Sequence, residues 1–242
     1  MRDKRQLAIR NNNELYRSIF ANHKIVLNRT DLICYTIEKT PLLYSNLVTI
    51  SKDWAPDEIF EKIDLKFIKE NWLEWSIKDS FAVLDLHKYN FLKLFDAQWF
   101  YLEAGNFTPT AQSENLSYKI IDNESDLAVW RTIWDSDDKL GKEIFNPKLL
   151  NNPLTYFVAG LKDEQIVSGC LINKSDDVLS ISNFFAPDKN IDYWSEMISF
   201  IFSSIEQTDI VGYQRNDLVD KLKTLGFEAV GNLIVWLKKQ DF

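Results

Sequence analysis

The stretch "SISNFFAPDKNIDYWSEMISFIF" (residues 180–202) decides the fold that we predict. It lies at the end of a partly alternating strand over 177–185, passes through a short loop and enters a helix over 192–206. The apolar residues of that helix form one stripe: Trp194, Met197, Ile198, Ile201 and Ile205. Backbone amides where such a helix begins can hold a phosphate. The loop has no glycine and two aspartates, so it is a cofactor site, the remnant of one, or only a connection.

The segments around this stretch predict an α/β (α+β) fold, with a mixed central sheet and flanking helices. The expected elements are a strand at 118–122, a helix at 125–134 capped by Ser125 or Asp126, a β-hairpin of 154–161 and 165–173, the strand and helix above, a strand at 209–213, a helix capped by Asn216 and ended by Gly226, and a strand at 233–239.

The first half predicts a similar ladder of elements. It comprises a strand at 43–50, a helix at 55–71 with Pro56 in its first position, a strand at 81–86, a helix at 87–95 and a strand at 97–104. "YSNL" (44–47) resembles "ISNF" (181–184), and the distance from each Asn to the last strand is similar, 56 positions to Leu102 and 54 to Leu237. We interpret this as a tandem duplication with a degenerate first copy: a domain at 1–107, a linker at 108–117 and a domain at 118–242.

Composition excludes several classes of protein. The net charge is −8, and all of it comes from residues 111–242, which hold 13 Lys/Arg against 21 Asp/Glu. This charge argues against nucleic acid or an anionic membrane as a partner. The two cysteines and two histidines make a metal site improbable, and we expect none. No apolar run suits a membrane span or a signal peptide, so a cytoplasmic location is expected. Self-association stays open.

The second half resembles the GNAT superfamily of acyl-CoA-dependent N-acyltransferases, over about residues 118–238. The resemblance rests on the hairpin "YFVAGLKDEQIVSGCLIN" with Gly160 and Gly169, on the opening stretch, and on the ending "LVDKLKTLGFEAVGNLIVWLK" with its "LGF" motif. It implies a GNAT-like fold, acetyl-CoA or another acyl-CoA as cofactor, and a small-molecule or peptide amine as substrate. The first half resembles the family only through its likeness to the second.

The resemblance also implies where the cofactor binds. A strand splayed from its neighbour, here 178–186 beside 209–213, offers its edge to pantetheine, and the loop after it faces the pyrophosphate. The cofactor-binding residues expected on this basis are Phe184, Phe185, Ala186, Asp188, Lys189, Asn190, Ile191, Asp192 and Asn216. Asp192 and Asn216 each have a simpler interpretation as helix caps. Two acids beside a single lysine would also repel a phosphate.

The catalytic residues cannot be assigned from the family pattern. Leu222 stands where many members carry the tyrosine that protonates the leaving thiolate, and Arg215 where an asparagine is common. Tyr213 and Tyr193 lie close in sequence to the expected site, although a buried structural tyrosine is the commoner case. The carboxylates conceivable as the base are Asp176, Asp177 and Glu206.

Three hypotheses for function follow. The first is an acyl-CoA-dependent N-acetyltransferase, whose acidic second half would suit a cationic amine. The second is a GNAT-like module that has lost catalysis and serves as a binding or scaffold protein, as the glycine-free loop suggests. The third is a ligand pocket between the halves, lined by Trp72, Trp75 and Trp99, although core packing is the commoner role of such rings.

Overall fold

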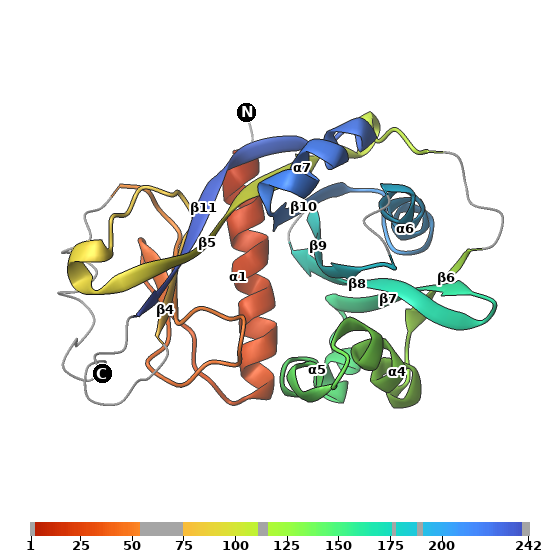
Figure 1. The fold of residues 1–242 in the computed structure, drawn as a ribbon, viewed down its shortest axis with the longest axis horizontal. Helices are drawn as coiled ribbons and strands as arrows, with labels where there is room; N and C mark the ends of the chain where they lie inside the picture. Colours follow the sequence, from red (N-terminus) through yellow and green to blue (C-terminus); the bar gives the residue numbers. More distant parts are fainter. Residues whose placement is uncertain (1–2, 54–74, 111–115, 176–177, 188–190, 239–242) are drawn as a thin grey trace.

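The computed structural model describes residues 3–53, 75–110, 116–175, 178–187 and 191–238. Its strands form one eleven-stranded mixed sheet in the order β1-β2-β3-β4-β11-β5-β10-β9-β8-β7-β6, with helices against its faces (Figure 1). The strands are β1 Asn28–Arg29, β2 Ile33–Tyr35, β3 Leu47–Thr49, β4 Ser76–Asp79, β5 Phe91–Leu102, β6 Ser117–Ile121, β7 Thr155–Lys162, β8 Gln165–Ser175, β9 Val178–Phe185, β10 Asp209–Gln214 and β11 Glu228–Lys238. The α-helices are α1 Lys4–Asn22, α4 Glu124–Trp134, α5 Lys139–Ile144, α6 Ile191–Ser204 and α7 Asn216–Leu222.

The two long strands β5 and β11 join the halves of the chain. β5 comes from the first half but lies between β10 and β11 of the second half, antiparallel to both. β11, the last strand, pairs in turn with β4 of the first half through residues 234–237. The last strand of each half therefore pairs with the strand that precedes the last one in the other half. A single sheet thus contains strands from both sides of the predicted linker at 108–117.

Each half contributes one parallel pair of strands beside this exchange. β3 is parallel to β4 in the first half, and β9 is parallel to β10 in the second. All other neighbours in the sheet are antiparallel. The repeated parallel pair and the exchanged last strands give the two halves related topologies.

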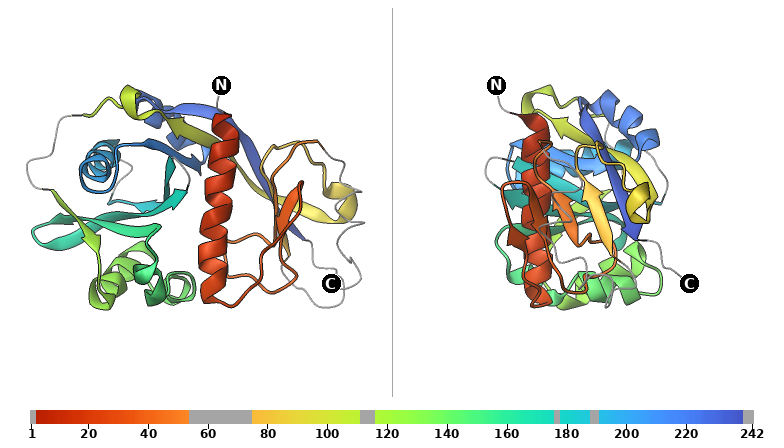
Figure 2. Two further views of the ribbon diagram at one scale, coloured as in Figure 1. Left: turned by 180° about the vertical axis from the view of Figure 1, so that it is seen from behind. Right: turned by 90° about the vertical axis from the view of Figure 1, so that its left-hand side faces the viewer.

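Helix α1 stands between the two lobes, where it packs against strands of both halves (Figure 2). Its apolar face is interrupted by Asn11 and Asn13, which are both buried. The Asn11 amide donates to the carbonyl of Asn173 at 3.0 Å, and the Asn173 amide donates to the carbonyl of Asn11 at 3.3 Å. Asparagines in place of apolar residues obscure the helical pattern in the sequence, so this helix was not predicted.

The two faces of the sheet bury separate cores. On the α6 face, Trp194 and the apolar stripe of that helix pack with Phe100, Leu179 and Ile210. On the α1 face, Ile9 packs with Trp99, Val178 and Val211. Each of these three is adjacent in sequence to one of the strand residues on the α6 face. This alternation follows from the period of two along a strand.

The strands and helices predicted for the second half are present, and the structure adds α5, which the sequence pattern does not predict. The last strand, β11, begins at Glu228 rather than at 233, and two helix ends differ from the prediction. The cap of α4 is Asn123, whose side chain accepts a hydrogen bond from the Asp126 amide, rather than Ser125 or Asp126. Asn216 is the first residue of α7 and not its cap, because the N-cap position belongs to Arg215.

Two predictions for the first half are wrong. No strand forms at 81–86; the strand in this region is β4, which ends at Asp79. The chain turns after it because the buried Asp79 carboxylate accepts hydrogen bonds from the amides of Phe81 and Leu84. The helix expected at 87–95 is one 3₁₀ turn, His87–Tyr89, followed directly by β5. The helix expected at 55–71 and Trp72 lie outside the described residues.

The "LGF" motif gives a test of the fold. Gly226 has φ +98°, and an added Cβ would stand 2.1 Å from the carbonyl oxygen of Asn106. We expect Gly226→Ala to lower the free energy of unfolding by about 1–3 kcal/mol, because backbone strain adds to the clash. Denaturant unfolding measures this change. Gly105→Ala is the control, since nothing lies within 4 Å of its added Cβ; equal destabilisation by both would contradict the argument.

Candidate functional site

Strands β9 and β10, the two strands that the resemblance implies are splayed, pair over only part of their length. Their parallel register runs from Asp209–Val178 to Val211–Ser180 and then ends, although β9 continues to Phe185 and β10 to Gln214. Gly212 lies at the point of separation, where an added Cβ would stand 2.7 Å from the carbonyl oxygen of Ile181. The pair is therefore closely packed up to Gly212 and open beyond it, as a slot for an extended ligand requires.

A β-bulge bends β9 within this open part. The register with β8 shifts between Gly169–Phe185 and Leu171–Ser182, so β9 has one more residue than its partner there. Asn183 lies in the bulge with φ 52°, in the left-handed region that asparagine tolerates better than most residues. Bulges redirect strands and occur often beside active sites.

The side chains of Phe184 and Phe185 face the protein interior. The Phe184 ring stacks on Trp194 of α6 at a centroid distance of 4.2 Å. The Phe185 ring meets Trp130 of α4 edge-on at 5.0 Å. Both rings thus fix the position of the β9 backbone, and it is this backbone that would contact a ligand in the slot.

The other predicted cofactor residues are only partly placed. Ala186 follows β9 and is half-buried, and Ile191 and Asp192 form the first turn of α6. Asn216 begins α7, directly after β10. Asp188, Lys189 and Asn190 lie outside the described residues. The described members therefore lie along β9, at the beginning of α6 and after β10, as expected from their order in the chain.

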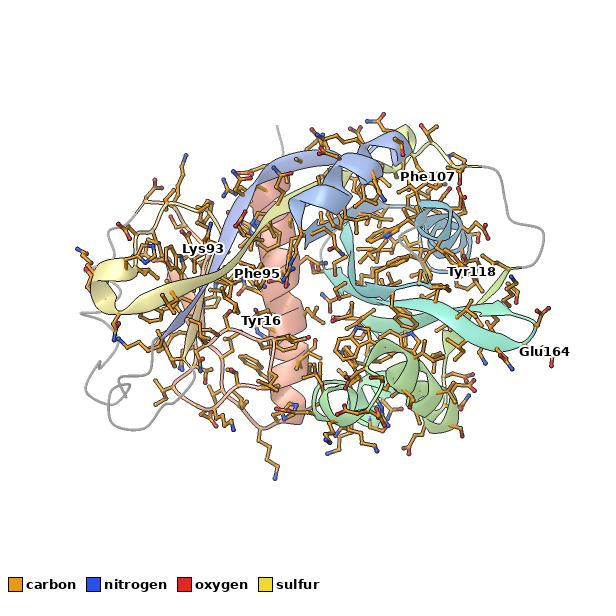
Figure 3. All side chains as sticks on the ribbon, in the orientation of Figure 1. Tyr16, Lys93, Phe95, Phe107, Tyr118 and Glu164 are labelled. Carbon is orange, nitrogen blue, oxygen red and sulfur yellow. The ribbon has the colours of Figure 1, made fainter. Side chains whose placement is uncertain are left out.

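A pocket of about 460 Å³, which we call the central pocket, lies between the halves next to the slot. Its walls come from α1, the 40–45 loop, β4, β5, β11 and the parting ends of β9 and β10. Trp99 lines it, but Trp75 belongs to a separate core cluster of the first half. Figure 3 shows Tyr16 and Phe95, which both line the pocket, in the middle of the molecule. The structure therefore contains the cavity between halves that the third hypothesis requires.

Lys78 is the most unusual residue of the central pocket. Its side chain projects from β4 and is 1% exposed. The ammonium group donates to Asn12 Oδ1 at 3.0 Å and to the Tyr213 hydroxyl at 3.3 Å, and it lies 4.3 Å from the centroid of the Tyr213 ring. Burial lowers the pKa of Lys78, and the neighbouring Tyr213 opposes this effect. Within the described chain, no carboxylate pairs with this lysine.

Tyrosines surround Lys78. The Tyr16 ring lies 4.8 Å from its ammonium group, and the Tyr16 hydroxyl accepts a hydrogen bond from the Ser45 amide at 3.2 Å. Burial raises the pKa of Tyr16 to about 12 and that of Tyr44 well above its usual value. These phenols therefore stay protonated at neutral pH and present hydroxyl groups.

The acid–base candidates from the sequence are separated by the fold. The Tyr213 hydroxyl contacts Lys78 in the central pocket, whereas Tyr193 lies in the first turn of α6, outside the pocket lining. Leu222 is fully buried, and Glu206 forms an ion pair with Lys174. Asp176 and Asp177 lie outside the described residues. The described lining of the pocket includes no Asp, Glu or His, so the acidity of the second half does not extend to it.

Sequence reasoning missed Lys78, Asn12, Tyr16 and Tyr44. The available signal was "WSIK" (75–78), where Trp75 and Ile77 alternate as in a strand and place Lys78 on the opposite face. Only the fold shows that this second face is buried as well.

The described residues contain no group of three or more His, Cys, Asp or Glu side chains suited to a metal ion. Among the described helices, none has the length and apolar character needed to cross a membrane.

No family model and no curated protein matches the sequence. Solved structures do match the fold. A GCN5-related N-acetyltransferase from Kribbella flavida superposes with a TM-score of 0.68 at 12% identity, covering 97% of this chain and 96% of that chain. A functionally unknown conserved protein from Staphylococcus epidermidis gives a TM-score of 0.68 at 13% identity, with 92% and 98% covered.

A tandem GNAT protein from the clavulanic acid biosynthesis pathway also matches. Its TM-score is 0.56 at 7% identity, and the match covers 81% of this chain and 76% of that chain. The mixed sheet with flanking helices, the parting of β9 from β10 and these similarities lead to one conclusion. The chain has the fold of the GCN5-related N-acetyltransferases, as the resemblance in its sequence implies.

Proposed function

We propose that this protein is an acyl-CoA-dependent N-acyltransferase that acts on an amine of a small molecule or peptide. The observation that carries the proposal is the parting of β9 and β10 beyond Ser180 and Val211, next to a pocket large enough for a small substrate. A fold alone does not determine a function, so the argument rests on this geometry.

The exposed edge of β9 fits the extended arm of an acyl-CoA. Phe184 and Phe185 hold this edge through their partly buried rings, so its backbone groups are fixed in place before any ligand arrives. At the end of the edge, the first turn of α6 offers backbone amides to a phosphate. The bound cofactor would supply an activated acyl group as a thioester.

The protein's contribution to transfer is mainly positioning. The slot and the central pocket adjoin at Ser180–Asn183, so an acyl group in one and an amine in the other would meet there. A backbone amide of the bulged segment would polarise the thioester carbonyl, as donors in an oxyanion hole do. Burial of the pocket between α1 and the sheet limits the access of water.

One observation favours a second candidate, a binding module without catalysis. The described pocket lining lacks the carboxylate or histidine that usually removes a proton from the amine. In this case the slot and pocket would bind ligands without group transfer.

Acetyl-CoA binding tests what both candidates share. We expect saturable binding in calorimetry with a Kd on the order of 10⁻⁴ M, corresponding to about −5.5 kcal/mol, because backbone contacts favour binding while Asp188 and Asp192 repel phosphate. The release of free CoA thiol from acetyl-CoA in the presence of a panel of amines then distinguishes the two candidates. Thiol release supports the enzyme, and binding without release supports the module. Absence of binding to the folded protein would reject the acyltransferase and would leave only a module that binds other ligands.

Hydrogen exchange locates the bound cofactor. With saturating acetyl-CoA, we expect slower amide exchange in peptides covering 181–187, because those amides become hydrogen-bonded or shielded. The hairpin of β1 and β2, residues 28–35, lies at the opposite edge of the sheet; it serves as the internal control and should exchange unchanged. Protection confined to that hairpin would show that the slot is not the binding site.

A further inference from the structure

The central pocket contains hydrogen-bond donors that the described protein does not use. An ammonium group has three N–H donors, and Lys78 directs two of them to Asn12 and Tyr213. Both contacts use the oxygen atoms of these partners as acceptors, which leaves the Tyr213 O–H and the Asn12 NH₂ as donors. For these two groups and for the third N–H of Lys78, no acceptor exists within the described chain.

Among the described residues, no anion compensates the charge of this cluster, and the faces of the Tyr16 and Tyr213 rings lie against the ammonium group. Lys78 is almost fully buried, and its neighbours in the pocket, Asn12, Tyr16, Tyr44 and Tyr213, are neutral. A buried cation without an anionic partner is unfavourable. A bound anion with several acceptor sites would satisfy both the charge and the unused donors, and a carboxylate does so with two oxygens.

The mouth of the pocket is apolar. Leu42, Leu43 and Leu94 line it and are 52%, 64% and 56% exposed. Leu43 is held at φ 70°, a conformation that an L-residue adopts at some cost. The pocket thus combines a cationic, donor-rich base with leucines at its opening.

We propose that the central pocket binds a small carboxylic acid with an apolar body, whose carboxylate accepts hydrogen bonds from Lys78, Tyr213 and Asn12. As a statement about the substrate, this rests on the proposed function. The carboxylate belongs either to the amine acceptor, as in an apolar amino acid, or to the acyl group of the donor.

Paired probes that differ in the carboxylate test the proposal. Calorimetry compares L-leucine and L-phenylalanine with their carboxamides, and succinyl-CoA with acetyl-CoA, for the wild type, Lys78→Met and Lys119→Met. Lys119 is the matched control, because it lies on β6 at the end of the sheet and pairs there with Asp126. We expect the wild type and Lys119→Met to bind at least one acid about tenfold more tightly than its uncharged counterpart. In Lys78→Met this preference should fall below about threefold.

The different probes distinguish a carboxylate on the amine acceptor from one on the acyl donor, and they separate carboxylate binding from the proposed acyltransferase function. Preference for the amino acids places the carboxylate on the acceptor, and preference for succinyl-CoA places it on the acyl group. Equal binding of every pair by the wild type, or an unchanged preference in Lys78→Met, would overturn this inference. Binding of the amino acids without any binding of acetyl-CoA would leave it standing and reject the proposed function instead.

Stability provides a readout that does not depend on any ligand. Lys78→Met removes a buried cation that pairs with no carboxylate among the residues that the structure describes, so we expect its melting temperature at neutral pH to exceed that of the wild type by about 3 °C or more. A lower melting temperature would show that Lys78 is already compensated within the protein.

The pH dependence of this difference has a defined sign. Because the pKa of Lys78 is lowered in the folded state, the unfolded chain binds more protons between that pKa and 10.5. Wild-type stability should therefore rise relative to Lys78→Met as the pH increases through this window. The titratable groups that contact Lys78 among the described residues are Tyr16 and Tyr213, and both are present in the two proteins that are compared.

Discussion

The antiparallel pairing of β5 with β11 is the interaction on which the rest of the structure depends. It comprises ten residue pairs between strands that close the two halves of the chain. Through it, β4 is joined to one side and β10 to the other, so the parallel pairs of both halves belong to one sheet. Lys78 and Tyr213 are 135 positions apart in sequence, and this pairing is what brings them into contact. The central pocket is a consequence of the same exchange, because its walls come from both halves.

The slot and the central pocket are built in different ways. The slot is a feature of the backbone. It depends on Gly212 at the point of separation, on the bulge at Asn183, and on two phenylalanine rings that pack into different cores and hold β9 in place. The pocket is a feature of side chains from α1, β4 and β10 that meet at one point. Backbone amides need no particular side chain, so a loop without glycine is compatible with a slot of this kind.

The cluster around Lys78 opposes folding and therefore points toward binding. A lysine that is 1% exposed and has no carboxylate partner in the described part of the chain reduces the stability of the free protein. As a rule, buried charges in proteins are paired. Natural proteins break this rule mostly at sites where function requires an unpaired charge. The same group is neutral more readily than an exposed lysine, because burial lowers its pKa, and an anionic ligand would restore its charge.

The sequence by itself determined most elements of the second half and, through its resemblance to the GNAT superfamily, the fold. Local periodicity is strong there, and the residues that form the slot lie in two short segments. In the first half, buried asparagines interrupt the apolar pattern of α1, so the sequence does not predict this helix. β4 ends at Asp79, whose carboxylate accepts backbone hydrogen bonds, although the apolar pattern of a strand continues beyond it. Only the tertiary structure decided the exchange of last strands and the central pocket. Both depend on contacts between residues far apart in the chain, and such contacts leave no local pattern in the sequence.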